Sequence, residues 1–491
     1  MTKTISILHI SDLHRSPGDE VSNAALLSSL LNDKDNYRDS EPKKIQEPDL
    51  IIVSGDIIRG STDPDNSDKE IEEQYKEAND FLNDLCQHFL DGDKDRLVII
   101  PGNHDIDWKY SKESMKKIDS KQVLDDSSLV KSHYLKAAIN QHSNIRWSWK
   151  DLSFYEIDDL EKYNRRLEAF SRFYSLFYEN KKIYSLNPEE QYEIFDYPYF
   201  NLTVVAYNSC YRNDHLNFVG DVHPNCIANS NLKLREYKKR GRLILATWHH
   251  NIKGPPYEIN YMDSSRLKNF IDAGISLGFH GHQHKTEIIH EFSDVVEQKK
   301  ITVFSAGTLC GGQKELPTGN NRQYNLVEII WNNEESDLTV ILNTREKTET
   351  SSFDNPIWKA GRIDSNLISY HAIKITKPKS QGVAANLIEV ENLIRDKEYD
   401  TAIEELLKFD LQDIFVRKYL AECIIQTERF ELALEVFSEP MTDEEMIIVL
   451  NAAIELNNRT KMLEIKSAIG NNSLLSPIVK ELLGKIEAII K

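Results

Sequence analysis

Residues 5–14 read ISILHISDLH, and the pattern of this stretch indicates the fold because it recurs along the chain. A β-branched apolar run is followed at once by two polar side chains, those of Asp12 and His14. Short apolar runs of this kind are typical of strands that are buried on both faces of a sheet. The same pattern recurs at 50–53, 97–100, 202–207, 243–246, 275–279, 301–304, 324–330 and 338–342. Helix-like stretches such as 71–90 lie between several of these runs, so the sequence predicts an α/β fold.

Two changes in pattern divide the chain. Residues 106–200 lack strong strand signals and contain helix-like, aromatic-rich segments, which predicts a helical insertion or cap. Residues 376–385 combine Pro, Gly, Ser and Lys, as linkers do. We therefore predict a first domain over 1–375 and, after the linker, an all-α domain over 386–491.

The C-terminal region contains a weak internal repeat. Segments 397–408 and 428–438 align with an offset of 31 residues, and each has an aromatic residue three positions before an alanine. This spacing favours stacked helix pairs of the tetratricopeptide (TPR) type, with an ordinary helical bundle as the alternative. Because stacked pairs form surfaces that bind peptides or subunits, we expect a protein partner at these helices.

Composition and charge favour a globular protein and argue against a general nucleic-acid coat. The 491 residues are 40% hydrophobic and 28% charged, which is typical of globular proteins. The net charge of −19 argues against a general nucleic-acid coat, although 109–150 holds nine basic and four acidic residues. That stretch either steers an anionic substrate or forms a solvated helical face. Five cysteines without CxxC spacing, and the lack of a signal peptide or long apolar run, predict a cytoplasmic protein that does not bind membranes.

Polar clusters follow five of the predicted strands. They contain Asp12 and His14, Asp56, Asn103 to Asp105, His249 and His250, and His282 and His284. In open α/β sheets, the crevice beyond the carboxyl ends of strands binds ligands. Carboxylate, amide and imidazole groups without thiolates suit Mn, Fe, Zn, Ni, Co or Mg. So many ligands exceed the needs of one ion, which predicts two divalent ions that share a bridging carboxylate. Two such ions polarise a phosphoryl oxygen and lower the pKa of water.

The order DLH, GD, GNHD, HH and GHQH resembles the calcineurin-like metallophosphoesterase superfamily over roughly 1–345, apart from the insertion. The resemblance implies a two-sheet α/β sandwich flanked by helices and the hydrolysis of phosphoesters. It also implies roles for individual residues. Metal ligands would be Asp12, His14 and His284 at the first ion and Asn103, His249 and His282 at the second, with Asp56 bridging them. His104 would protonate the leaving oxygen or stabilise phosphoryl charge, and Asp105 would orient His104.

The chain departs from the family pattern at two places that bear on these roles. Family members often read HHP, whereas this chain reads His249-His250-Asn251, so either histidine could be the ligand, and we favour His249. Arg59 follows the bridging carboxylate and could contact phosphate, but we favour a surface ion pair.

The motifs also bear on the substrate. Protein Ser/Thr phosphatases of this superfamily show GDxVDRG and GNHE, whereas this chain has GDIIRG and GNHD. The latter forms resemble cyclic-nucleotide phosphodiesterases and SbcD-like nucleases, so we expect a phosphodiester substrate, nucleotide or nucleic acid, with manganese as the first choice of metal. The alternatives are a phosphomonoesterase or protein phosphatase, and a protein-interaction scaffold with a vestigial metal site.

Overall fold

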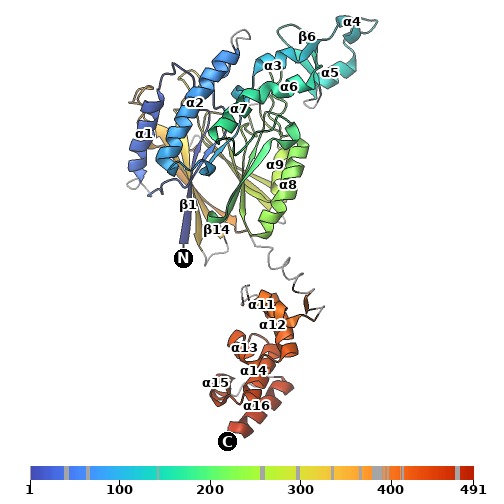
Figure 1. Cartoon of the computed structure of the whole chain (residues 1–491). Coiled ribbons are helices and arrows are strands. Elements are labelled where there is room, and N and C mark those ends of the chain that lie inside the picture. The colour runs from blue at the N-terminus through green and yellow to red at the C-terminus, as the bar shows by residue number, and fades with distance from the viewer. Residues whose placement is uncertain are drawn as a thin grey trace. The chain divides into compact units, whose positions relative to one another are not determined.

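A computed structural model gives the fold (Figure 1). It describes residues 2–37, 44–61, 67–140, 143–254, 260–294, 299–332, 337–363, 368–378, 390, 393–394, 397–407, 409, 411, 414–469 and 476–490. The chain forms two compact units, Met1–Lys379 and Ser380–Lys491.

The first sheet of the N-terminal unit has a parallel half and an antiparallel half. The parallel strands are β1 (Thr2–Ile10), β2 (Leu50–Val53) and β3 (Leu97–Ile99). The antiparallel strands are β13 (Gln323–Asn332), β14 (Asp337–Lys347), β15 (Trp358–Ala360) and β16 (Tyr370–Thr376). Strands β1, β2 and β3 therefore end at the same edge of the sheet.

The second sheet has the order β11-β12-β10-β9-β8-β7. Its four central strands are parallel: β12 (Lys299–Ser305), β10 (Ile275–His280), β9 (Leu243–Thr247) and β8 (Leu202–Tyr207). Antiparallel strands β11 (Glu287–Asp294) and β7 (Tyr192–Tyr197) form the two edges. Its parallel strands share one carboxyl edge, as those of the first sheet do.

Helices cover the outer faces of the two sheets (Figure 1). They are α1 (Asn23–Asp35), α2 (Ser67–Leu90) and α7 (Glu168–Phe177) on one side and α8 (Pro224–Lys239) and α9 (Ser265–Asp272) on the other. Strand β8 shows the layering, because Val204 faces the core between the sheets whereas Val205 packs with α8 and α9. Short 3-10 turns lie at Lys94–Arg96, Asn103–Asp105, Arg165–Leu167, Pro188–Glu190 and Pro198–Phe200.

The structure confirms the predicted α/β sandwich, and each of the nine predicted strands is present. The prediction missed β7 and β11, which are the edges of the second sheet. Strand β7 reads YEIFDY and has only two fully buried positions, so it lacks the continuous apolar run of a central strand. The sequence signal was therefore strong only where both faces of the sheet are covered.

The insertion is not purely helical. A small lobe (residues 108–164) follows β3 in the sequence and contains a three-stranded sheet of its own. Its elements are α3 (Trp108–Glu113), β4 (Met115–Lys117), α4 (Ser120–Val123), α5 (Ser132–Ile139), β5 (Ile145–Ser148), β6 (Ser153–Ile157) and α6 (Leu160–Asn164). These strands are short and alternate polar with apolar residues, which is why they escaped prediction. Buried Asp214 anchors the lobe by accepting hydrogen bonds of 2.8 Å from Arg146 and Tyr163.

The described residues of the C-terminal unit form α-helices and no strand, as predicted. Its helices are α11 (Tyr399–Leu406), α12 (Ile414–Thr427), α13 (Phe430–Val436), α14 (Asp443–Glu455), α15 (Arg459–Ile469) and α16 (Pro477–Ile490). Ala402 and Ala433, the equivalent alanines of the repeat, are both fully buried in its own core. The predicted linker 376–385 lies mostly outside the described residues, and the TPR assignment stays a prediction.

Two further features of the fold are the state of its cysteines and the hydropathy of its helices. The five cysteines are buried and form no disulfide, and burial raises the pKa of the Cys423 thiol to about 12. Within the described part of the chain, no helix is both long enough and apolar enough to span a membrane.

Candidate metal centre

The backbone takes an unusual conformation just beyond the ends of three strands, β1, β2 and β10. Asp12, His14, Asp56, His282 and His284 all have left-handed backbones, with φ of 51°, 46°, 50°, 74° and 56°. Non-glycine residues adopt this conformation at a cost of roughly 1–3 kcal/mol each, and such strain concentrates at functional sites. Tight turns, and not the alternation of side chains along an extended strand, therefore bring the side chains of Asp12 and His14 together.

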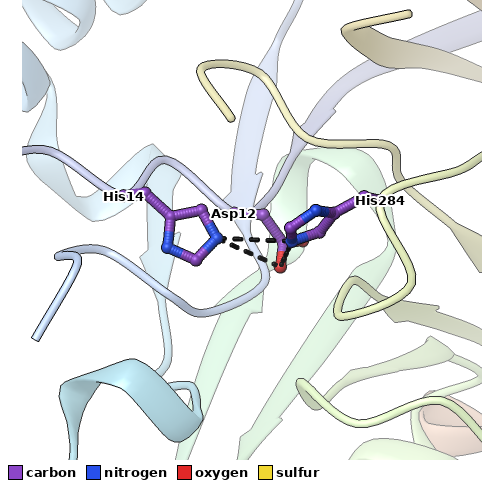
Figure 2. Close-up of side chains that lie close together, drawn as sticks. All are labelled: Asp12, His14 and His284. Carbon is purple, nitrogen blue, oxygen red and sulfur yellow. Dashed lines mark hydrogen bonds and ion pairs between the residues drawn. The ribbon is translucent and has the colours of Figure 1, made fainter. Parts of the chain in front are cut away.

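The first group of side chains contains Asp12, His14 and His284, which come from the ends of β1 and β10 (Figure 2). His284 Nε2 lies 3.3 Å from Asp12 Oδ1 and 3.3 Å from His14 Nε2. The Nε2 atom of His14 lies 4.0 Å from the same Asp12 oxygen. Three potential ligand atoms thus face one point.

The second group contains Asn103, His249 and His282. Asn103 Oδ1 lies 3.0 Å from His249 Nε2 and 2.8 Å from His282 Nδ1. The two imidazole nitrogens are 3.3 Å apart. The amide oxygen and both ring nitrogens are hydrogen-bond acceptors when the rings are neutral, so this cluster also suits a cation.

Asp56 lies between the two groups. Its Oδ2 is 3.2 Å from His249 Nε2 in the second group and 4.0 Å from His14 Nε2 in the first. Its other oxygen, Oδ1, accepts a 2.8 Å hydrogen bond from the backbone N–H of His104. Gly102 makes this approach possible, because a Cβ atom there would lie 2.1 Å from Asp56 Oδ1. Asp56 therefore lies where a ligand shared by the two groups would be placed.

The two adjacent histidines point in different directions. His249 faces Asp56 and Asn103, as described above. His250 turns away, and its Nδ1 and Nε2 atoms lie 2.9 Å from Ser209 Oγ and 3.4 Å from Asn213 Nδ2. Of the two candidates left open by the sequence, the geometry therefore favours His249 as the ligand.

Backbone carbonyls fix the ring tautomers of two site histidines. His249 Nδ1 donates to the carbonyl of Ser54 at 2.9 Å, and His284 Nδ1 donates to that of Glu315 at 2.8 Å. Since a carbonyl can only accept, Nδ1 carries the proton, and the Nε2 lone pair of each neutral ring faces the site. Such outer hydrogen bonds are typical of metal-binding histidines.

The charges of the site also suit cations. Burial alone would raise the pKa values of Asp12 and Asp56, but neighbouring histidines hold both below the usual range, so both carboxylates stay ionised. Burial would lower the pKa of His249 and His284, but the Asp56 and Asp12 carboxylates raise each pKa to about 9. The carboxylates therefore hold positive charge here, and bound cations would take the place of those protons.

The spacing fits two divalent ions. Ligand atoms about 2.1 Å from one ion lie roughly 3.0–3.4 Å from each other in octahedral or tetrahedral geometry. Most of the separations given above fall in or near this range. In addition, burial lowers the pKa of His14 to about 4 and of His282 to about 3, so these rings are neutral ligands. The residues present fit a pair of divalent ions.

His104 is exposed beside this centre, and its ring lies edge-on to that of His14 at 4.7 Å between centroids. Its Nδ1 donates to the Arg59 carbonyl at 2.7 Å, which leaves Nε2 to exchange a proton. Asp105 is buried away from this ring and accepts hydrogen bonds from the Gly102 amide and the Tyr75 hydroxyl at 2.7 and 2.9 Å. The expectation that Asp105 orients His104 is therefore wrong, because the Arg59 carbonyl holds that ring.

The carboxyl of Asp105 instead joins two loops of the site. Besides Gly102, its Oδ2 accepts a 3.2 Å hydrogen bond from the amide of Ile57, next to Asp56. Burial and the Asp56 charge raise the pKa of Asp105 to about 7. Sequence reasoning missed Tyr75, which lies on α2, and nothing in its local sequence marks it.

Arg59 and Ser209 are two further polar residues near the centre. Arg59 forms an ion pair of 3.0 Å with Asp19, as favoured from the sequence. Ser209 Oγ accepts hydrogen bonds of 3.0 and 3.1 Å from the backbone amides of His249 and His250, a role that sequence reasoning missed. A signal was present, because Ser209 follows a predicted strand, 202–207, as the five recognised clusters do.

A known protein family matches the part of the chain that contains the site. The family described as "Calcineurin-like phosphoesterase" matches residues 5–286, which include all five motifs. Among solved structures, the chain is similar to a dimetal phosphatase from Danio rerio, at 10% identity and a TM-score of 0.36, over 76% of this chain and 99% of that one. No curated protein matches the chain. Because the matched segment covers more than half of its length, the chain belongs to the calcineurin-like phosphoesterase family.

Proposed function

We propose that this phosphoester hydrolase acts on phosphodiesters of nucleotides or nucleic acid, with manganese as its preferred metal. The observation that carries the proposal is the meeting of carboxylate, amide and imidazole groups from both sheets around Asp56. A vestigial scaffold would have no need of five strained backbones or of histidine tautomers fixed by carbonyls.

Each side chain of the centre has its own proposed role in the reaction. Asp12, His14 and His284 would hold one ion and Asn103, His249 and His282 the other, with Asp56 shared. When bound, the ions polarise the phosphoryl oxygens and lower the pKa of water. His104 Nε2 is placed to give a proton to the departing oxygen, because its Nδ1 is engaged by the Arg59 carbonyl. The next residue, Asp105, joins the loops that carry Asp56 and Asn103 through its hydrogen bonds to the Ile57 and Gly102 amides.

Two observations support a phosphodiester substrate. The GDIIRG and GNHD forms depart from the protein-phosphatase pattern. Arg59 is paired with Asp19 and is 47% exposed, so its guanidinium is not directed at the centre as a fixed clamp for a terminal phosphate.

The proposal is tested by a substrate screen of the full chain with Mn²⁺, Mg²⁺, Zn²⁺ and Ni²⁺ in turn. We expect bis-p-nitrophenyl phosphate and a nucleotide or nucleic-acid diester to be hydrolysed faster than p-nitrophenyl phosphate and a phosphopeptide, with Mn²⁺ most effective. Preference for the monoesters would contradict the proposal and favour a phosphatase, and no hydrolysis with any metal would favour a scaffold.

Replacing Tyr75 by phenylalanine is expected to lower kcat about 10-fold, which is typical for loss of a group that supports metal ligands. The change removes the hydroxyl that donates to buried Asp105 while keeping the ring stacked on Phe173. Steady-state rates on bis-p-nitrophenyl phosphate would show the effect. Tyr110→Phe is the control, because that ring is only partly buried. Equal rates for wild type and Tyr75→Phe would mean that Asp105 needs no support from α2.

We further propose that the C-terminal helices bind a protein partner. The two copies of the repeat bury equivalent alanines, and the unit has a hydrophobic core separate from that of residues 1–379. These helices carry none of the side chains assigned to the metal centre.

Deleting residues 381–491 is therefore expected to leave kcat and KM for bis-p-nitrophenyl phosphate within about twofold of the full chain. The physical reason is that both sheets and every proposed ligand belong to the first unit. Circular dichroism would verify that the shortened protein is folded. Loss of hydrolysis in a folded truncation would show instead that the helices complete the catalytic fold.

A further inference from the structure

Two aromatic rings lie together where the small lobe meets the second sheet. Trp108 begins α3, and Phe218 lies in the loop between β8 and α8. Their ring centroids are 6.4 Å apart at an interplanar angle of 52°. Phe218 is 44% exposed, whereas Trp108 is half-buried against the core of the first unit. One ring is thus held firmly, and the other presents an apolar surface to solvent.

Both rings belong to segments that border the metal centre. Trp108 lies four residues after exposed His104, the proposed proton donor. Phe218 lies two residues, or at most about 7 Å, before Gly220. A Cβ atom on Gly220 would lie 2.4 Å from the Cβ of His250, next to the ligand His249. The segment of Trp108 thus follows His104 closely along the chain, and the segment of Phe218 packs against His250, which is next to the ligand His249.

Hydrogen bonds fix the two segments to each other. Ser111 of α3 and His215 of the loop are joined by a 2.7 Å hydrogen bond between Oγ and Nδ1. Buried Arg166 connects them a second time, because its carbonyl accepts from the Asp107 amide at 2.9 Å and its guanidinium donates to the Tyr211 carbonyl at 3.1 Å. The two segments that carry the rings are thus joined before any ligand binds, which lowers the entropic cost of binding.

We propose that Trp108 and Phe218 form a stacking platform for a nucleobase of the substrate next to the scissile phosphate. This inference rests on the proposed phosphodiester hydrolysis and names the substrate class as base-containing, single-stranded nucleic acid. An exposed ring stacks on any base through its π face, so the platform supplies affinity without sequence preference. The net charge of −19 gives a reason for such a device, since the protein cannot rely on a general positive field to hold a polyanion.

The test compares two oligonucleotides with the same phosphates. One is a short single strand of thymidylate, and the other has the same length with an abasic tetrahydrofuran in place of every nucleoside. Assayed with Mn²⁺, the full-length wild type should show a kcat/KM about 10-fold higher on the thymidylate strand, given the usual energy of stacking on one ring. Phe218→Ala should remove this preference through KM and leave the rate on the abasic strand unchanged. Phe218→Tyr should keep it.

The control variant is Leu232→Ala, which shortens another exposed apolar side chain, on α8. Equal wild-type rates on both strands, or an equal fall on both in Phe218→Ala, would overturn the platform. So would a wild type that cleaves bis-p-nitrophenyl phosphate but neither strand, although phosphodiester hydrolysis itself would then stand. Failure to hydrolyse any diester would instead overturn the proposed function.

Discussion

Replacing Asp56 by asparagine is expected to lower kcat at least about 10³-fold, since two ions supply several kcal/mol of transition-state stabilisation. Asp56 Oδ2 lies within 3.2 Å of His249 Nε2 and 4.0 Å of His14 Nε2, so one atom serves both groups. An amide is nearly the same size but lacks the negative charge that attracts a pair of cations. The measurement is kcat on bis-p-nitrophenyl phosphate together with the metal content of the desalted protein.

Asp56→Asn should fold normally. Its Oδ1 can still accept the His104 amide, but the change removes the 3.2 Å ion pair between Asp56 and protonated His249. In EDTA at neutral pH, the melting temperature should therefore lie below that of the wild type, because the histidines that hold the pKa of Asp56 below its usual range stabilise its charged form. Asp84→Asn, an exposed site on α2, is the matched control. An Asp56→Asn protein with normal metal content and normal kcat would remove this residue from the bridging role.

Replacing His104 by alanine should lower kcat about 10²–10⁴-fold on a nucleotide diester, the range typical of general acid catalysis. The same variant should lose less activity on bis-p-nitrophenyl phosphate, because nitrophenolate departs readily without a proton. Metal content should stay at the wild-type level, since the ring is exposed and held by the Arg59 carbonyl. Parallel assays of the two substrates would measure the difference.

His371→Ala, an exposed histidine on β16, is the control for this variant. His104 also lies within ligand distance of His14 and Asp56, so a direct role in holding an ion must be distinguished from proton transfer. A fall in metal content for His104→Ala, with equal losses on both substrates, would identify His104 as a ligand rather than an acid.

The positions of the motifs could be read from the sequence because each follows a strand buried on both faces. Runs such as 50–53 and 243–246 are apolar throughout, and their polar successors reach the shared carboxyl edge. Edge strand β7 and the strands of the small lobe alternate polar with apolar residues, so their signal was too weak.

The way in which the motifs converge could not be predicted. Asp12 and His14 adopt left-handed backbones because their amides donate to the carbonyls of Gly55 and Asp56, 43 and 42 residues away. No local propensity favours this conformation for aspartate or histidine strongly enough to predict it. Only the pairing of two loops, each at the end of its own strand, produces it.

Contacts between distant segments also give Asp105 a role that differs from the one its position in the sequence predicts. Its position after His104 suggested that it orients that ring, but Tyr75 and the Ile57 amide occupy the carboxyl instead. The neighbours of a buried carboxyl depend on how α2 packs over the first sheet. That packing is tertiary, and a motif of four residues carries no information about it.

Metal content and activity should be measured together on the full chain, first after EDTA treatment and desalting and then after titration with Mn²⁺. Convergent ligands shared through Asp56 predict that hydrolysis of bis-p-nitrophenyl phosphate is absent without metal and reaches its maximum at about two bound ions per chain. Full activity in the metal-free protein, or a maximum at one ion with no second site, would contradict a dinuclear centre.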